Sequence, residues 1–327
     1  MDDIKLSVVI PTKNAGPLLQ QVLEGIISQK TNWSFEVLVV DSGSTDGTVE
    51  LVKRNLSVRL LEIPASEFGH GKTRNLAIAN TKGDFIAMLT QDALPENQSW
   101  LAELVNTIEI DTRIAGVFGR HIAYPDASPF TRNELEQHFI GFLPKPVVEL
   151  DNCDRYEHEE GYRQFLYFFS DNNALLRRLV WEQIPYPEVD FAEDQAWARL
   201  IIEAGYRKAY AHDAVVYHSH NYGFIERLRR SFDEAYSLRK LFNYQHGRGF
   251  RHAVRSFIGI TIRDFRFAVQ MGLFKSHFWH VLSMPLDNFM RVAGHYLGAN
   301  GSRLPNYVRS CLSRDYQLKK RSLGEVI

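Results

Sequence analysis

The stretch "FEVLVVDSGSTDGTVELVKRN", residues 35–55, decides the fold class. Its first half is an unbroken apolar run that ends at Asp41, which is the pattern of a strand buried on both faces. Its second half places Ser and Thr, which favour helix caps, in front of a helical pattern. A buried strand that leads through a short polar turn into a helix is the repeating unit of a parallel α/β sheet.

The same alternation continues on both sides of this stretch. It predicts an α/β fold with a mainly parallel sheet flanked by helices. The expected strands are residues 6–11, 35–41, 57–63 and 84–92, and the expected helices are residues 16–28, 44–55 and 71–81.

Polar side chains stand where three of these strands end. Thr12 and Asn14 follow the first strand, Asp41 follows the second, and Thr90, Gln91 and Asp92 close the fourth. Ligands of open α/β sheets bind beyond the carboxyl ends of the strands. The three polar ends therefore predict a binding cleft.

The texture changes after residue 224, from alternating strands and helices to long helical patterns rich in Arg and aromatic residues. We predict a first domain over residues 1–224 and a helical second region over 225–327. The first carries 20 Lys and Arg against 32 Asp and Glu, and the second 18 against 7. A basic region of this kind suits an anionic partner.

Two cysteines, Cys153 and Cys311, stand far apart and in no metal-binding spacing. They suit a reducing compartment and a fold without a disulfide framework. The first residues lack the pattern of a signal peptide, and no apolar run reaches the roughly 18 residues of a membrane span. We expect a cytoplasmic protein.

The letters "GKT" at residues 71–73 invite an ATPase interpretation, because they close the phosphate-binding loop of many nucleotide-binding proteins. That loop needs a second glycine five residues earlier, and Ser66 occupies this position. The loop would also have to follow the first strand. A helix start bearing Lys72, Arg74 and Asn75 remains, which suits a diphosphate or is simply a solvated helix end.

Five segments in order, "SVVIPTKN", "VLVVDSGSTDGT", "GKTRNLA", "LTQDA" and "FAEDQAWARLIIEAGY", resemble glycosyltransferase family 2 over about residues 5–222. The resemblance implies the nucleotide-sugar-binding fold called GT-A, which is Rossmann-like. "FGHGKTRNLA" together with "LTQDA" is similar to bacterial rhamnosyltransferases, which use dTDP-L-rhamnose to build surface polysaccharides.

The resemblance implies a donor site, in which Asp41 accepts the N3–H of uracil or thymine. The alternative for Asp41 is a turn of the Asx type, and for Thr12 a Pro-Thr turn, while Asp46 is interpreted as a helix cap. The residues matched to nucleotide-sugar binding are Pro11, Thr12, Asn14, Asp41, Lys72, Arg74, Asn75, Thr90 and Gln91.

Asp92 matches the aspartate that holds Mg²⁺ or Mn²⁺ against the diphosphate in the family. Hard divalent cations prefer carboxylate oxygens. The first acidic member of the family motif is missing here, because Thr90 stands in its place, and this leaves strict metal dependence open. His218, or alternatively His220, matches a histidine that completes the metal shell, and the two project to one face of a predicted strand.

Asp194 matches the base that takes the proton of the acceptor hydroxyl, with Glu193 as its alternate or orienting partner. Acidic residues are also favoured in the first turn of a helix, which is the plainer explanation of this pair. Asp171, Asn172 and Asn173 follow an aromatic strand. They either bind sugar hydroxyls or form a polar turn.

Three interpretations of the basic region stay open: aromatic residues that pack on the catalytic domain or support an oligomer, a surface that lies on anionic lipid, and nucleic-acid binding, which we disfavour because no recognised motif accompanies the charge. The lipid interpretation would place the protein on the inner face of the cytoplasmic membrane.

The resemblance implies an inverting transfer of L-rhamnose from dTDP-L-rhamnose to a saccharide or lipid-diphosphate-linked acceptor, without a covalent sugar intermediate. The same fold with a UDP-hexose or UDP-N-acetylhexosamine is the nearest alternative. A non-catalytic nucleotide-sugar or lipid-surface binder is another. A nucleotidyltransferase is disfavoured, because no glycine-rich triphosphate loop stands near the first strand.

Overall fold

The computed structural model describes residues 4–189, 191–245, 247 and 249–317. These residues form two compact units. The first comprises the described residues up to Pro125 together with Glu134–Ser219, and the second comprises Asp126–Asn133 and the described residues from His220 onward. The division falls close to the predicted boundary at residue 224, but the segment Asp126–Asn133 also belongs to the second unit. That segment is too short to carry a compositional signal of its own.

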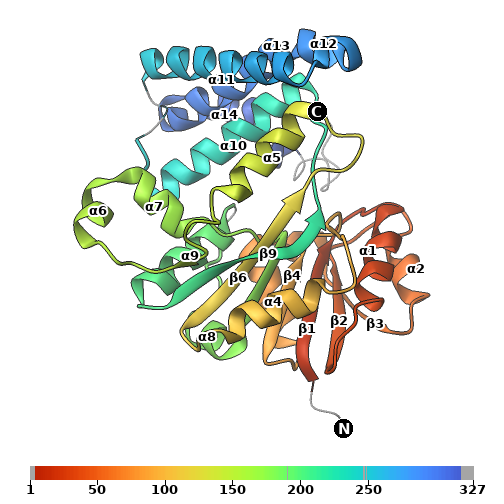
Figure 1. The fold of residues 1–327 in the computed structure, drawn as a ribbon. Helices are drawn as coiled ribbons and strands as arrows, with labels where there is room; N and C mark the ends of the chain where they lie inside the picture. The colour runs from red at the N-terminus through yellow and green to blue at the C-terminus, as the bar shows by residue number, and fades with distance from the viewer. Residues whose placement is uncertain (1–3, 190, 246, 248, 318–327) are drawn as a thin grey trace. The chain divides into compact units, whose positions relative to one another are not determined.

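The first unit is built on one nine-stranded sheet of order β3-β2-β1-β4-β8-β6-β9-β5, with β7 paired to β9 off this path (Figure 1). The strands are β1 Ile4–Thr12, β2 Ser34–Asp41, β3 Val58–Glu62, β4 Phe85–Leu89, β5 Leu94–Pro95, β6 Ile114–Ile122, β7 Val147–Val148, β8 Asn173–Arg177 and β9 Arg207–Tyr217.

Six strands run in the same direction. β1 is parallel to β2 and β4, and β2 to β3. β8 runs antiparallel to both β4 and β6, so β6 points the same way as β4, and β9 is parallel to β6. The predicted mainly parallel α/β sheet is confirmed. The carboxyl ends of β1, β2, β4, β6 and β9 therefore share one edge, and the start of β8 lies at that same edge.

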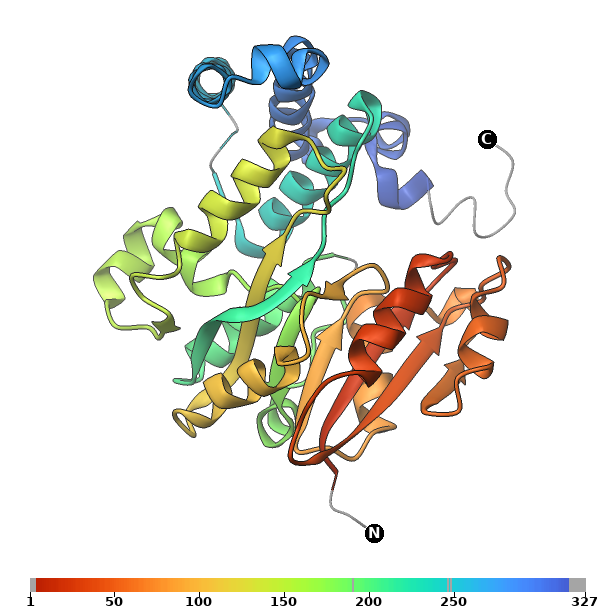
Figure 2. The same ribbon diagram turned by 45° about the vertical axis from the view of Figure 1, so that its right-hand side comes forward.

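The helices of the first unit flank its sheet (Figure 2). They are α1 Leu18–Ile27, α2 Thr48–Lys53, η1 Ala65–Glu67, α3 His70–Ala79, α4 Trp100–Glu109, α6 Cys153–His158, α7 Glu160–Tyr167, α8 Arg178–Gln183 and α9 Glu193–Glu203. A further helix, α5 (Pro129–Ile140), begins in the second unit and ends in the first.

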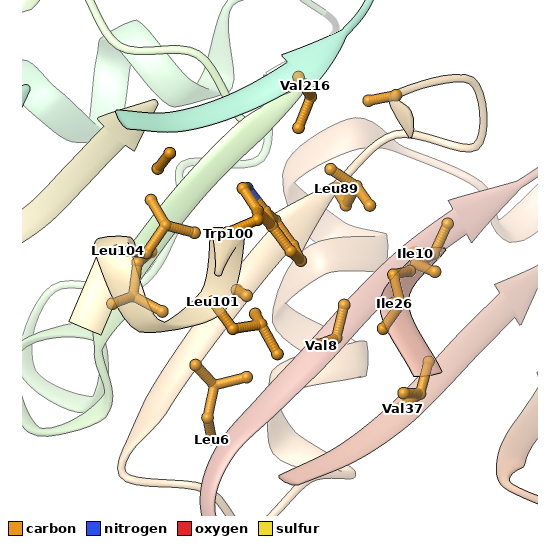
Figure 3. Close-up of a cluster of buried hydrophobic side chains, with 14 of the residues drawn as sticks. Leu6, Val8, Ile10, Ile26, Val37, Leu89, Trp100, Leu101, Leu104 and Val216 are labelled. Carbon is orange, nitrogen blue, oxygen red and sulfur yellow. The ribbon is translucent and has the colours of Figure 1, made fainter. Parts of the chain in front are cut away.

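The core of the first unit lies between the sheet and helices α1 and α4 (Figure 3). Trp100 is fully buried there, with Leu6 and Val8 of β1 and Ile26 of α1 in the same cluster. Val9, which points to the other face of β1, is equally buried. Burial of successive residues on both faces explains why the sequence of this strand is apolar without alternation.

The second unit is helical, as predicted (Figure 1). It contains α10 Phe224–Phe242, α11 Phe250–Gln270, α12 Leu273–Ser276, α13 Phe278–Ala299, η2 Gly301–Arg303 and α14 Asn306–Leu312. A Cβ on Gly294 or Gly298 of α13 would lie 2.3 Å from a backbone oxygen of α10. These two glycines therefore allow α10 and α13 to approach closely. None of the helices that the structure describes is long and apolar enough to cross a membrane.

Candidate active site

Asp41 ends β2 directly beside Thr12, the last residue of β1. One of its carboxylate oxygens accepts hydrogen bonds from the N–H groups of Gly43 (2.9 Å) and Ser44 (2.8 Å). The other accepts from the hydroxyls of Ser44 and Thr12. A carboxylate has about four acceptor positions, and three donors of this turn together with the Thr12 hydroxyl of β1 fill them. Asp41 thus forms the turn that was the alternative to base recognition, and contact with a base would require one hydroxyl to rotate away.

The loops that follow β1 and β2 are tied together by hydrogen bonds. Asn14 adopts a left-handed backbone (φ 47°), and its side-chain oxygen accepts from the N–H of Thr45 at 2.8 Å. Asp46 accepts from the N–H of Gly16 (3.0 Å) and from the N–H of Thr48 (3.1 Å), the first residue of α2. Asp46 is not the N-cap residue of α2, because Gly47 occupies that position, but its side chain still binds the first residue of the helix. These hydrogen bonds join the loops after β1 and β2 into one polar surface at the ends of the two strands.

Gln91 connects the end of β1 to the end of β4. Its side chain accepts from the N–H of Lys13 at 2.8 Å and donates to the carbonyl of Lys13 at 3.3 Å. The last residue pair between β1 and β4 is Val9 with Met88, and Pro11 lies beyond it. Because proline has no N–H, this position suits it: no hydrogen bond between β1 and β4 is lost. Among the residues that the structure describes, the buried hydroxyl of Thr90 has no hydrogen-bond partner.

Asp92 lies beside His218. The short strand β5 pairs Leu94 with Tyr217 of β9, and this register places the residues before Leu94 next to those after Tyr217. One Asp92 carboxylate oxygen is 3.7 Å from His218 Nε2. Two ligand atoms, each about 2.1 Å from a metal ion, can be at most about 4.2 Å apart, so this pair fits two positions of one coordination shell. His220, the alternate ligand, stands two residues further on as the first residue of that segment of the second unit.

The GKT glycine has a packing role. A Cβ on Gly71 would lie 2.1 Å from the carbonyl oxygen of Pro187, so only glycine allows that backbone to pass. α3 begins at His70, as the predicted helix requires, and Lys72 in its first turn is exposed. The letters that suggested an ATPase therefore mark a close approach of two backbone segments.

Arg74 is buried between two carboxylates. Its Nε lies 2.7 Å from an Asp171 oxygen, and one terminal nitrogen lies 2.5 Å from Glu193. Burial alone would lower the pKa of Arg74, but Glu193 and Asp171 outweigh it and raise this pKa above its ordinary value. The guanidinium, predicted to contact ribose and diphosphate, is thus engaged within the fold.

Asp194 completes this group, which we call the carboxylate cluster: Arg74, Asp171, Glu193 and Asp194. One Asp194 oxygen accepts from the backbone N–H of Asp171 at 3.3 Å, and the other from the N–H of Gln195 at 2.7 Å. Burial raises the pKa of Asp194 well above its ordinary value, and Glu193 and Asp171 raise it further, against the effect of Arg74. A higher pKa makes its carboxylate a stronger base than an exposed aspartate.

Asp171 shares this environment. Its first oxygen accepts from the Tyr186 hydroxyl at 2.8 Å, and burial raises its pKa to about 6 in spite of Arg74. Because β8 pairs Asn173 with Leu89 of β4, Asp171 lies at the edge where Thr90, Gln91 and Asp92 follow β4. The carboxylate cluster and the Asp92–His218 pair thus belong to the same edge of the sheet.

Two predicted contact residues are occupied elsewhere. Asn173 is fully buried; it accepts from Trp100 Nε1 (2.8 Å) and donates to the carbonyls of Ala214 and Arg120. Its predicted contact with sugar hydroxyls is wrong, because every heteroatom of its side chain serves the core. Asn75 accepts from Trp181 and from the backbone of Tyr186, to which it also donates. Asn172 between the buried Asp171 and Asn173 is half-buried.

Two tyrosines that sequence reasoning missed belong to the site. Tyr186 donates to Asp171, and the hydroxyl of Tyr124 donates to the carbonyl of Asp92 at 3.0 Å. Neither lies in a motif. Their only signal is that each stands next to a proline, which is too common to single them out.

Comparisons with known proteins show which family this chain resembles. The family model described as Glycosyl transferase family 2 matches residues 7–181. The O-antigen chain rhamnosyltransferase RfbN of Salmonella typhimurium is 34% identical over 92% of each chain. The O-antigen chain rhamnosyltransferase WbaN of Salmonella anatum is 31% identical over 91% of this chain and 90% of its own.

Solved structures show the same fold. The mannosyltransferase PcManGT from Pyrobaculum calidifontis, in complex with GDP-Man and Mn²⁺, gives a TM-score of 0.59 at 19% identity, over 91% of this chain and 90% of its own. Residues 1–349 of S. aureus TarS in complex with UDP give 0.51 at 18% identity, over 92% and 91%. At these identities the likeness supports the fold alone.

Proposed function

The chain belongs to glycosyl transferase family 2 and is a glycosyltransferase, and we propose that it transfers L-rhamnose from dTDP-L-rhamnose to a saccharide or lipid-diphosphate-linked acceptor in surface polysaccharide synthesis. The observation that carries the chemistry is the place of Asp194 in the carboxylate cluster, at the edge where the strand ends meet, where burial and the neighbouring carboxylates also raise its pKa. The observation that favours rhamnose is that two relatives matched over nine-tenths of the chain are rhamnosyltransferases.

In the proposed reaction, the Asp194 carboxylate takes the proton of an acceptor hydroxyl. At the same time, the oxygen of that hydroxyl bonds to the anomeric carbon of the sugar. The bond from that carbon to the diphosphate breaks, and its electron pair leaves with dTDP. Attack from the opposite side inverts the configuration without a covalent sugar intermediate. Arg74 holds Asp171 and Glu193, and the N–H of Asp171 fixes one Asp194 oxygen, so the base is oriented before the acceptor binds.

The donor would lie across the polar ends of β1, β2 and β4. Four side chains line this surface: Thr12, Asn14, Asp41 and Gln91. The unpartnered hydroxyl of Thr90 is suited to a ribose hydroxyl. Lys72, exposed in the first turn of α3, is suited to the diphosphate. A donor panel tests this assignment: we expect turnover and a thermal shift with dTDP-L-rhamnose. Turnover with a UDP-hexose or UDP-N-acetylhexosamine alone would contradict the choice of donor.

Asp92 and His218 would hold the divalent cation, Mg²⁺ or Mn²⁺, with His220 as the alternate ligand. The cation would neutralise charge on the leaving diphosphate. We expect Asp92→Asn to weaken Mn²⁺ binding in the presence of dTDP by about 10- to 100-fold, because a neutral amide is a poorer ligand than a carboxylate. Titration calorimetry measures this directly.

The matched control is Asp84→Asn, an exposed aspartate just before β4, at the opposite end of the same strand. It should leave Mn²⁺ affinity unchanged. Equal Mn²⁺ affinity for Asp92→Asn and the wild type would remove Asp92 from the metal site.

The proposed location is the cytoplasm. A non-catalytic binder, the remaining alternative, would bind nucleotide sugar yet show no transfer by the wild type.

A further inference from the structure

Helices α11, α12 and α13 of the second unit expose a large apolar surface. Of the 25 large hydrophobic side chains that are exposed among the described residues, 13 fall between residues 250 and 289. They are Phe250, Val254, Ile258, Ile262, Phe265, Val269, Met271, Phe274, Phe278, Trp279, Leu282, Leu286 and Phe289. Monomeric soluble proteins rarely expose apolar patches larger than a few hundred Å², so a surface of this extent indicates a partner.

These side chains form helical stripes. On α11 the exposed residues recur at positions 254, 258, 262, 265 and 269, and on α13 at positions 278, 282, 286 and 289. This is the spacing of one helix face, distinct from the face on which Asp264 and Asn288 are buried against each other. A ring contact of Phe265 with Phe274 (5.6 Å) links the α11 stripe to α12, and one of Phe257 with Phe289 (6.0 Å) links α11 to the α13 stripe. We call the joined surface the α11–α13 face.

The charges next to this face are basic. Residues 250–289 contain five Lys and Arg against two Asp. Both aspartates are paired: buried Asp264 accepts from Asn288 (2.9 Å), and Asp287 accepts from Arg227 (3.1 Å). Arg251, Arg255 and Arg266, in contrast, are exposed along α11. The partner that complements this surface is apolar in its interior and negatively charged at its border.

We propose that the α11–α13 face lies on the surface of an anionic lipid bilayer, with its apolar stripes in the interfacial region and its arginines at lipid phosphates. Trp279, 75% exposed, is of the residue type enriched at such interfaces. Interfacial helices combine an apolar face that bears Trp, Phe and Leu with flanking Arg and Lys, as α11 and α13 do. A second copy of the chain on this face would set its arginines against one another, so charge favours lipid. The proposal concerns the second unit and does not depend on the donor or the reaction.

The test uses the full chain and vesicles of phosphatidylcholine with or without phosphatidylglycerol. We expect co-sedimentation with the anionic vesicles, weakened as the salt concentration rises, and much weaker binding to pure phosphatidylcholine. Trp279→Glu combined with Leu282→Glu should weaken binding at least about tenfold, because two charges replace inserted apolar groups. Arg255→Gln with Arg266→Gln should reduce binding to anionic vesicles and leave the weak binding to neutral ones unchanged.

Leu56→Glu is the matched control, since Leu56 of the first unit is 99% exposed and lies outside the face. It should bind vesicles like the wild type, and thermal unfolding should show that every variant is folded. Wild-type protein that ignores anionic vesicles overturns the proposal. A second result would also overturn it: light scattering shows a dimer of the wild type, and the double change Trp279→Glu with Leu282→Glu converts this dimer to monomer but leaves vesicle binding unchanged.

Discussion

Replacing Asp194 with Asn is expected to lower kcat about 10²- to 10⁴-fold, the range that a general base contributes. The amide keeps the shape of the side chain, and its remaining oxygen can still accept from the N–H of Asp171 or Gln195. It cannot take a proton from the acceptor. Affinity for the donor, measured by titration calorimetry with dTDP-L-rhamnose, should stay within about twofold, since the change removes no contact assigned to the nucleotide.

The pH dependence of kcat provides an independent readout. A base must be deprotonated to act, and burial raises the pKa of Asp194 above the roughly 3.9 of a free aspartate. The rate should therefore fall on the acid side at a higher pH than an exposed aspartate would give. Because Asp171, with a pKa of about 6, interacts with Asp194, this acid limb of the pH profile reports the titration of the pair and not of a single residue. The acid limb should be absent from the profile of Asp194→Asn.

Asp154→Asn is the matched control, because the Asp154 side chain is 89% exposed and only pairs with His158 on α6. It should retain wild-type kcat and the same acid limb. Wild-type kcat in Asp194→Asn would exclude Asp194 as the base. The corresponding variant Glu193→Gln tests the alternate role of Glu193. A lower kcat that still falls on the acid side as in the wild type would indicate that Glu193 orients the carboxylate cluster through Arg74.

The sheet could be predicted because its strands are buried on both faces, and burial of this kind appears in the sequence as an unbroken apolar run. "LSVVIP" and "FEVLVVD" are examples, and both match β1 and β2 closely. The polar strand ends were visible for the same reason, since each apolar run stops abruptly. Thr12, Asp41 and Gln91 do lie at one edge, because β2, β1 and β4 are neighbours and parallel.

The partners of these residues could not be predicted, because they depend on how distant segments meet. Arg74 pairs with Asp171 and Glu193 only because β8 inserts antiparallel between β4 and β6 and brings its start to the carboxyl edge. An antiparallel strand of five residues leaves no mark in the sequence that differs from a parallel one. Asn173 was misassigned for the same reason, since nothing local shows that it faces Trp100.

Arg74→Met is expected to destabilise the first unit by about 3–5 kcal/mol at neutral pH. Methionine fills a similar volume, but it leaves Asp171 and Glu193 buried without the cation that neutralises them. The matched control is Arg59→Met. Arg59 is 53% exposed, and its partner Glu36 keeps hydrogen bonds from the Ser7 hydroxyl and the N–H of Lys82, so this change should cost no more than about 1 kcal/mol. Denaturant unfolding at pH 7.5 measures both.

The cost should shrink as the pH falls. A carboxyl group whose pKa is higher in the folded than in the unfolded state binds protons more tightly when folded, so its penalty is full above the folded pKa and vanishes below the unfolded one. The pKa of Asp171 is already about 6 beside Arg74, and removing that cation raises it further. Between about pH 7.5 and pH 5, Arg74→Met should therefore regain stability relative to the wild type. Adding Glu193→Gln to Arg74→Met should recover part of the loss at pH 7.5. A loss below about 1 kcal/mol, or one of equal size at both pH values, would mean that Arg74 does not neutralise this cluster.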